Sequence, residues 1–481
     1  MNQSENLSAG EPGYHRASVG EEFGRFCADF DLDTVPEAVL TSAALHILDT
    51  VGVGIGAAVL PGEADSARAA LAVVQESTGA SESSAYGLAR KVSAPAAALA
   101  NASLQHSLDF DDIHTDSRVH TSTMTVPAAL ALAERLGSTG RDVLAAVIVG
   151  NEVAARVGMG APRHVQHYGF HGTPVCGVFG VAAGAAVLLG LDADQTAHAL
   201  GIAADVAGGT NAWIAEGTSN KHLHAGWAAQ NGIIAAQLAA RGAKGPRLAF
   251  EGRFGFFDAL GRASDVRAGD VVESLGQRWA TAEIAYKAFP SCYWMHGSLG
   301  AAQQLRDSVL ASLDQVTVLE AIVPSAAVAL VLEPESTRLR PLTPYSAKFS
   351  LQYSVAAMIM RGFVDLTTYT TTAMHDEEIL DLAARITWRV DPDLDAGEQL
   401  YAGGLRVVFS GGNERTIITH DPLGTVENPM SDGQIIDKFR SCASLGLGAE
   451  DVRLLEHLLL EIAQLPSVDA IGAVMRRVTA Q

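Results

Sequence analysis

The chain has 481 residues, of which 48% are hydrophobic and 18% are charged, and its 33 basic and 54 acidic side chains give a formal net charge of -21. This length predicts two domains, and this composition is typical of a globular protein. The negative charge argues against nucleic acid and anionic membranes as partners, so a small anionic substrate would need a local cationic pocket.

The cysteines and the N-terminus bear on the location of the protein. The four cysteines lie far apart without a Cys-x-x-Cys pair, which argues against zinc ribbons, iron–sulfur clusters and a disulfide framework. Residues 1–20 are polar and lack an apolar signal segment, so we expect a flexible leader and a cytoplasmic location. The longest apolar run, 175–191, is rich in Gly and Ala, and we interpret it as a buried core helix.

Apolar residues follow helical spacing from about residue 35 to about residue 242. Thr34 and Pro36 are typical of a helix start, and Gly, Pro or Asp/Ser/Thr clusters separate the later segments. The pattern predicts helices over 36–57, 63–77, 92–107, 125–136, 141–157, 174–189, 194–206 and 223–241. We therefore expect a mainly α protein in which residues 21–283 form the first part of a large helical domain.

The sequence pattern changes near residue 280. Residues 316–332 contain β-branched runs, 386–390 predict a short strand, and 405–409 with 416–419 predict a hairpin. Helical spacing resumes at 432–442 and 449–465. We therefore expect a smaller α+β domain at residues 284–423, inserted in a helical domain that the segment 424–481 completes.

The segment between the predicted helices 92–107 and 125–136 is unusually rich in ionisable side chains. Its four aspartates, three histidines and one arginine are Asp109, Asp111, Asp112, Asp116, His106, His114, His120 and Arg118. A buried junction of this kind would be costly to keep for structure alone, so it is our active-site hypothesis. The alternative is a solvated acidic loop, because loops are ordinarily polar.

Two other patterns resemble known sites in the wrong context. Gly52-x-Gly54-x-x-Ala57, followed by Glu76, resembles a dinucleotide fingerprint, but the glycines end a helix instead of joining a strand to a helix. His164, His167 and His171, with Asp111 and Asp112, offer metal ligands. Gly169 would interrupt a helix there, so we expect no metal, and we place His171 before a helix N-terminus that favours an anion.

Three further segments carry candidate residues. Lys221 and His224 lie one helical turn apart, although basic residues at a helix start are also common surface caps. Lys287 falls where the helical and α+β regions meet, which is a common place for a ligand cleft. Tyr353 follows Lys348 in the inserted segment, and a core aromatic with a solvated hydroxyl is an equal alternative for it.

Together these residues resemble the MmgE/PrpD superfamily. The matching motifs are His106-Ser-Leu-Asp-Phe-Asp-Asp, Val119-His-Thr-Ser, Gly150-Asn-Glu-Val-Ala-Ala-Arg, Gly169-Phe-His-Gly-Thr, Lys221-His-Leu-His-Ala-Gly and Lys287-Ala-Phe-Pro-Ser-Cys. Each motif is weak alone, but the colinear series from about residue 25 to 470 is specific to the superfamily.

The resemblance implies a helical domain built from both chain ends, an inserted α+β lid, a homodimer, and no metal or redox cofactor. Members include 2-methylcitrate dehydratase, cis-aconitate decarboxylase and iminodisuccinate epimerase. In decarboxylase-like members the proposed catalytic site matches Asp109, His120, His171, Lys221, Lys287 and Tyr353. This chain has Ile113 where many members have Thr, and its His120-Thr-Ser122 looks closer to decarboxylase-type or epimerase-type members than to typical methylcitrate dehydratases.

These residues suggest a lyase that moves a proton on a carbon next to a carboxylate. In this hypothesis Arg118 and the two lysines hold a di- or tricarboxylate, His120 exchanges the proton and Asp109 orients His120. The clustered cations would keep nearby histidines and lysines from full protonation. His171 and Tyr353 would assist after lid closure, and Asp112, Ser122 and His224 are further substrate-binding candidates.

Three alternatives stay open from the sequence. The same residues suit an epimerase of an iminodisuccinate-like substrate. Ile113 favours a non-catalytic binding protein on the same fold. A metal hydrolase would use His164, His167 and His171.

Overall fold

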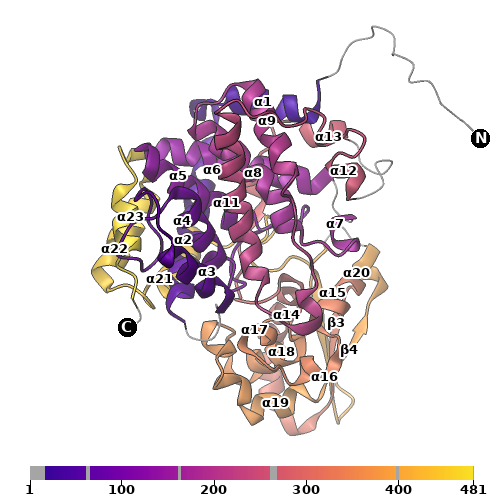
Figure 1. Cartoon of the computed structure of the whole chain (residues 1–481). Coiled ribbons are helices and arrows are strands. Elements are labelled where there is room, and N and C mark those ends of the chain that lie inside the picture. The colour runs from indigo at the N-terminus through magenta and orange to yellow at the C-terminus, as the bar shows by residue number, and fades with distance from the viewer. Residues whose placement is uncertain (1–16, 61–64, 161–163, 261–267, 397–399, 480–481) are drawn as a thin grey trace, which may run out of the picture.

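The computed structural model describes residues 17–60, 65–160, 164–260, 268–396 and 400–479, and most of them are helical (Figure 1). Each helix that the apolar spacing predicts is present, with ends within a few residues of those expected. These are α2 (Glu37–Val59), α3 (Asp65–Glu76), α4 (Ala94–Gln105), α5 (Ser122–Leu136), α6 (Gly140–Gly160), α8 (Gly172–Leu188), α9 (Ala193–Ala204) and α11 (Lys221–Ala239).

The first helix, α1 (Val19–Ala28), begins inside the segment expected to be a flexible leader. Residues 1–16 lie outside the described residues, but Ser18 and Glu21 form a capping box that starts α1. Phe23 and Cys27 bury one face of this helix. The end of the expected leader is therefore part of the helical core.

The apolar helix α8 lies at the centre of the helical part and packs against α6 and α11. This confirms the interpretation of the longest apolar run as a core helix. Among the described residues, α2 and α6 are long and apolar enough to cross a membrane. However, 72% and 89% of their most apolar windows are buried in the protein, which indicates core helices.

The inserted segment contains a four-stranded sheet in the order β4-β3-β5-β6. Its strands are β3 (Val316–Val323), β4 (Ile386–Val390), β5 (Gly403–Phe409) and β6 (Glu414–Thr419). The expected short strand and hairpin are confirmed. The β-branched run from 316 to 332 divides into a strand and the helix α15 (Ser325–Val331), because Pro324 has no N–H to continue the ladder and begins the helix instead.

Helices α14 (His296–Leu310) and α18 (Leu351–Arg361) pack beside the sheet and share a hydrophobic core with it. A different core joins α2 to the C-terminal helices α21 (Asp432–Ala443), α22 (Ala449–Leu460) and α23 (Asp469–Met475). Figure 1 shows these C-terminal helices beside the N-terminal part of the chain. The boundaries at residues 284 and 423 stay our proposal for the inserted domain.

A short two-stranded ladder places the acidic junction against the start of the insert. Strand β1 (Ile113–His114) pairs antiparallel with β2 (Ile284–Ala285), and Ile113 lies opposite Ala285. Because Lys287 follows β2 by two residues, this ladder brings the junction and Lys287 together.

We predict that Gly180→Ala destabilises the protein by about 1–3 kcal/mol, because a methyl group there overpacks the crossing of α6 and α8. Its Cβ would lie 2.3 Å from the Gly150 carbonyl oxygen. Gly433→Ala is the matched control, because Gly433 is exposed in α21 with open space around it, and we expect no loss or a gain of up to about 1 kcal/mol. Equal thermal unfolding midpoints for the two variants would contradict the packing argument.

Candidate active site

The junction between α4 and α5 is buried, so the alternative of a solvated acidic loop is wrong. Asp109, Asp111 and Asp112 are each at most 1% exposed, and Asp116 is the one aspartate of the four that faces solvent. Asp109 and Arg118 have positive φ angles of 52° and 58°, which are uncommon for non-glycine residues. Strained backbone of this kind is typical of functional sites.

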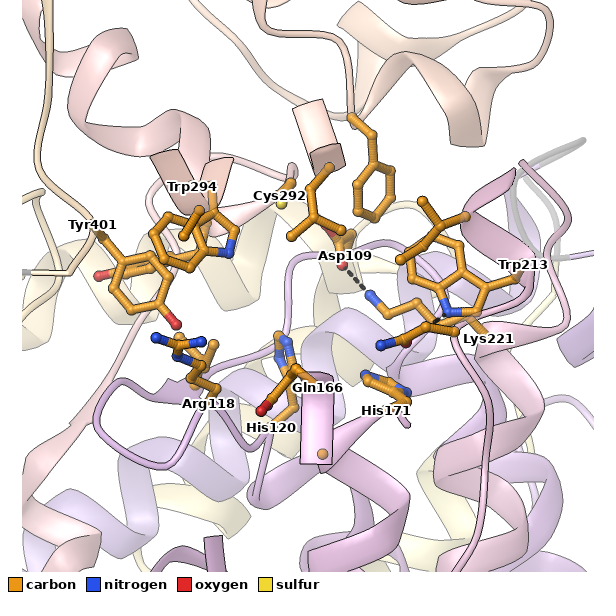
Figure 2. Close-up of a pocket in the computed structure, with 18 of the residues that line it drawn as sticks. Asp109, Arg118, His120, Gln166, His171, Trp213, Lys221, Cys292, Trp294 and Tyr401 are labelled. Atoms are coloured by element: carbon orange, nitrogen blue, oxygen red, sulfur yellow. Dashed lines mark hydrogen bonds and ion pairs between the residues drawn. The ribbon is translucent and has the colours of Figure 1, made fainter. Parts of the chain in front are cut away.

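A cavity of about 210 Å³ lies between this junction and the inserted segment (Figure 2). The helical part contributes the junction, the N-terminus of α8 and the segment around Trp213. The insert contributes the segment after β2, one face of α15, Phe349 and Tyr401. Residues that line the cavity include Asp109, Ile113, Arg118, His120, His171, Trp213, Lys221, Lys287, Trp294, Ala326, Leu330 and Phe349.

Asp109 binds both lysines. Its Oδ1 accepts a hydrogen bond of 2.7 Å from Lys221 Nζ and lies 3.4 Å from Lys287 Nζ, which also donates to the Asp109 carbonyl oxygen at 2.8 Å. Burial alone would raise the pKa of Asp109, but the two lysines outweigh burial and hold it well below its usual range. For the cation Lys221, burial alone would lower the pKa, but the negative charge of Asp109 outweighs burial and raises it. The expectation that clustered cations deprotonate the lysines is therefore wrong for Lys221.

His120 is oriented by Asp111, not by Asp109 as expected. Its Nδ1 lies 3.1 Å from Asp111 Oδ2 and 2.7 Å from the Asp112 carbonyl oxygen. Both neighbours are acceptors, so we assign the proton to Nδ1, which leaves Nε2 for the pocket. Burial would raise the pKa of Asp111, but His120 and His106 outweigh it and keep the pKa well below its usual range. The pair therefore has the geometry of a carboxylate that orients a general acid or base.

The histidines around His120 are held neutral. His106 Nδ1 lies 2.7 Å from Asp111 Oδ2, yet burial lowers its pKa to about 4. His171 stacks on His106, and burial, followed by the charge of Lys221, lowers its pKa well below the usual range. His224 contacts His171 through the two Nδ1 atoms at 3.1 Å, and burial lowers its pKa to about 4. A neutral imidazole can accept a proton, so this part of the expectation agrees with the structure.

Arg118 is the cation of the pocket without a carboxylate partner among the described residues. Its guanidinium carbon lies 5.6 Å from the ring centroid of Trp294, and its buried Nε has no hydrogen-bond partner there. Figure 2 shows Arg118 and Lys221 on opposite sides of His120. This arrangement leaves Arg118 available to a carboxylate of a ligand.

Four of the ten candidate residues do not line the cavity. Tyr353 is fully buried in the core of the insert, where its hydroxyl donates to the Thr368 carbonyl oxygen at 2.8 Å. This corrects its expected catalytic position and agrees with the core-aromatic alternative, except that the hydroxyl is not solvated. The hydroxyl oxygen of Ser122 accepts a hydrogen bond of 3.4 Å from Asn151 Nδ2, and His224 contacts the lining residue His171 without lining the cavity itself.

Asp112, the fourth of these, belongs to a second buried polar layer beneath the cavity. Its carboxylate lies 2.8 Å from His46 Nδ1. Next to this pair, Lys438 donates to Asp49 at 3.0 Å and to the Phe110 carbonyl oxygen at 2.7 Å. The sequence pattern gave no prediction of this layer, although His46 and Asp49 are ionisable residues inside the apolar helix α2.

The described residues include one cluster with the ligand types of a metal site, formed by His106, Asp111 and His120. Both Nδ1 atoms point at the same carboxylate oxygen, and Lys221 and Lys287 add positive charge nearby. This chemistry suits a shared hydrogen-bonded carboxylate better than a divalent cation.

The glycine pattern that resembles a dinucleotide fingerprint and the histidines considered as metal ligands do not form sites in the described residues. Gly52 and Gly54 lie inside α2, where Phe439 and Tyr86 pack against them, so no strand-to-helix turn exists for a dinucleotide. His167 is exposed, and the side chain of His164 lies outside the described part. Among the described residues, His171 and His167 do not belong to a group of metal-ligand side chains, and the expectation for His164 lies outside them.

Comparisons with known proteins agree with the resemblance of the motifs. Residues 21–268 match the MmgE/PrpD N-terminal domain, and residues 289–462 match the MmgE/PrpD C-terminal domain. A cis-aconitate decarboxylase-like protein of Aspergillus oryzae is 27% identical over 464 residues, which cover 92% of this chain and 94% of that protein. Cis-aconitate decarboxylases of Aspergillus terreus and Homo sapiens are 27% and 28% identical, over 94% and 79% of this chain and 95% and 79% of their own lengths.

We predict that the protein loses stability as the pH falls from about 6.5 towards 4. The pKa values of His106 and His224 in the folded protein are about 4, below the ordinary value of 6.5, so the unfolded chain binds more protons in this window. The midpoint of thermal unfolding should therefore decrease across it. This loss of stability begins at a pH higher than that at which carboxylates become protonated.

His106→Asn should weaken this pH dependence, because the amide does not titrate. His167→Asn is the control, because His167 is on the surface. A midpoint that rises as the pH falls through this window would contradict the assignment of neutral buried histidines.

Proposed function

The chain belongs to the MmgE/PrpD family, and we propose that it is a lyase that acts on a small di- or tricarboxylate by proton transfer next to a carboxylate, without a metal or redox cofactor. The observation that carries the proposal is the cavity in which Arg118, Lys221 and Lys287 surround His120. The net charge of the chain is -21, yet three cationic side chains line this one cavity, and such a local concentration of positive charge favours an anionic ligand.

Loss of CO2 is the reaction that we propose first, because the relatives named above are called decarboxylases. In this step the bond between carbon and a carboxylate breaks, and its electron pair stays on the substrate. The pair delocalises towards a second carboxylate that a cation holds, and a proton from His120 Nε2 forms the new C–H bond. Loss of water would use the same groups, with a base removing the C–H proton and an acid protonating the leaving hydroxide.

The contacts around His120 suit this role. The ionised Asp111 keeps Nδ1 protonated and would stabilise the imidazolium that exists when Nε2 also carries a proton. Asp109 holds the two lysine ammonium groups on one side of the cavity, so their charge is fixed before the substrate binds. Neutral His171 is the second group that we propose to accept or donate a proton.

We extend the proposal to a cytoplasmic location. All four cysteines are buried and free, which fits a reducing compartment.

We predict that His120→Ala lowers kcat by about a hundredfold or more, the usual contribution of a positioned acid or base, while the protein stays folded. Its thermal unfolding midpoint should decrease, because the buried Asp111 loses one of its two histidine partners. The assay uses cis-aconitate, 2-methylcitrate and iminodisuccinate, and it follows CO2 release, absorbance of a new conjugated double bond and proton exchange by NMR. Tyr353→Phe is the control, because its hydroxyl bonds within the insert. We expect it to keep nearly normal kcat.

Full activity of His120→Ala would remove His120 from the mechanism. Inversion of a stereocentre without release of CO2 or water would favour an epimerase. Binding of these compounds without turnover would favour a non-catalytic binding protein. Loss of activity after dialysis against a chelator, restored by a metal, would contradict the proposal of a metal-independent lyase.

We also propose that the protein is a homodimer that pairs through α11. Trp227, Ile234 and Leu238 are 47%, 38% and 44% exposed, and their spacing places them on one face of that helix. No ionisable side chain occurs between His224 and Arg241. Because two copies that each carry a charge of -21 repel, an uncharged apolar stripe is the surface best suited to bring them together.

We predict that the double variant Trp227→Glu/Ile234→Glu sediments with half the mass of the wild-type protein, because the new charges would be desolvated and repel across the interface. Leu342→Glu is the control, because Leu342 is 78% exposed and belongs to the insert, not to the apolar stripe of α11. A monomeric wild-type protein at micromolar concentration would contradict the dimer, and a dimeric double variant would contradict this interface.

A further inference from the structure

The cavity has an apolar wall as well as a cationic side. Ile113, Trp213, Trp294 and Phe349 line it, and each is at most 8% exposed. They belong to one hydrophobic cluster that joins the junction to the core of the insert. The antiparallel pairing of β1 with β2 fixes the backbone of Ile113, so this wall is a built part of the cavity.

The helix α15 adds a second apolar contribution. Ala326 and Leu330 lie one helical turn apart on α15, and both line the cavity. Ala326 is exposed and Leu330 is partly buried, so this face of α15 lies at the mouth of the cavity. A group that extends from the cationic side towards α15 would therefore meet hydrocarbon.

The apolar wall lies directly beside the cations. Lys221 Nζ is 5.5 Å from the ring centroid of Trp213 and 5.4 Å from that of Phe349. The Trp213 indole N–H is already bonded to Asn211 Oδ1 at 3.2 Å. A carboxylate placed against this wall would lose its hydration without gaining that donor, whereas a hydrocarbon group would bury apolar surface.

The charges of the cavity match two carboxylates better than three. Lys221 and Lys287 share the ionised Asp109, while Arg118 has no carboxylate partner among the described residues. Two carboxylates would therefore balance the three cations and one anion. A third would bring excess negative charge into a cavity that already contains Asp109 and lies close to Asp111.

We infer that the substrate carries two carboxylates and a hydrocarbon substituent, and that Ile113, Trp213, Leu330 and Phe349 form the subsite for this substituent. The inference rests on the proposed function, because it assumes that the cationic side holds the substrate carboxylates. It makes Ile113 a specificity-determining residue, because its side chain is the part of the acidic junction that faces the substituent.

The test measures binding by calorimetry with the full-length protein. The probes are succinate, 2-methyl-, 2-ethyl- and 2-butylsuccinate, and propane-1,2,3-tricarboxylate, which has as many non-hydrogen atoms as 2-butylsuccinate. We expect each added methylene to tighten binding by roughly threefold to fourfold until the subsite is full. 2-Butylsuccinate should bind at least about tenfold more tightly than the tricarboxylate.

Ile113→Thr should reduce this preference for the alkyl chain, because it replaces an ethyl group of the wall by a hydroxyl. Leu342→Thr, on the exposed surface of the insert, should leave it unchanged. Arg118→Ala should weaken binding of all the probes together, because it removes a cation that every one of them needs.

Tighter binding of the tricarboxylate than of 2-butylsuccinate would overturn the inference. The same holds if Ile113→Thr leaves the alkyl preference unchanged. Neither result would contradict the proposed lyase, provided that Arg118→Ala weakens binding and His120 supports turnover of a polycarboxylate. Failure of every probe to bind, together with no turnover of any polycarboxylate, would instead contradict the proposed function.

Discussion

The shared carboxylate of Asp109 is the interaction on which the rest of the cavity depends. Its partners, Lys221 and Lys287, come from the start of α11 and from the start of the insert, so one ion cluster joins three distant parts of the chain. All three side chains are buried. Removing one member would leave a buried charge without its partner, which is far more costly than the net value of the cluster itself.

Neighbouring aspartates of the junction have different roles because their side chains point in different directions. Asp109 binds the lysines, Asp111 binds His106 and His120, and Asp112 lies against His46 and offers its carbonyl oxygen to His120. The left-handed backbone at Asp109 turns the chain at this point. A segment that looks like one acidic cluster therefore forms three separate buried groups, in which Asp109 binds two lysines, Asp111 binds two histidines and Asp112 lies against one.

The cavity also explains how a strongly acidic protein can accept an anion. The cations do not stand alone, since Asp109 raises the pKa of Lys221 and contacts both lysines, while burial lowers the pKa values of the surrounding histidines. Positive charge is thus concentrated in one cavity on both sides of His120, where low-dielectric surroundings strengthen its electric field. The apolar side chains of that wall line the rest of the cavity.

The sequence by itself determined the long helices between residues 36 and 241, the strand 386–390, the hairpin and most of the candidate residues. The spacing of apolar side chains along a helix or strand is a local property, so it can be recognised without the tertiary structure. The tertiary structure decided which aspartate orients His120, that Tyr353 points into the core of the insert, and that Trp213, Phe349 and Leu330 complete the cavity. These facts depend on side-chain direction across a junction with positive φ and on contacts between segments far apart in the chain. Neither leaves a periodic trace in the sequence, because packing settles both only when the helical part and the insert come together.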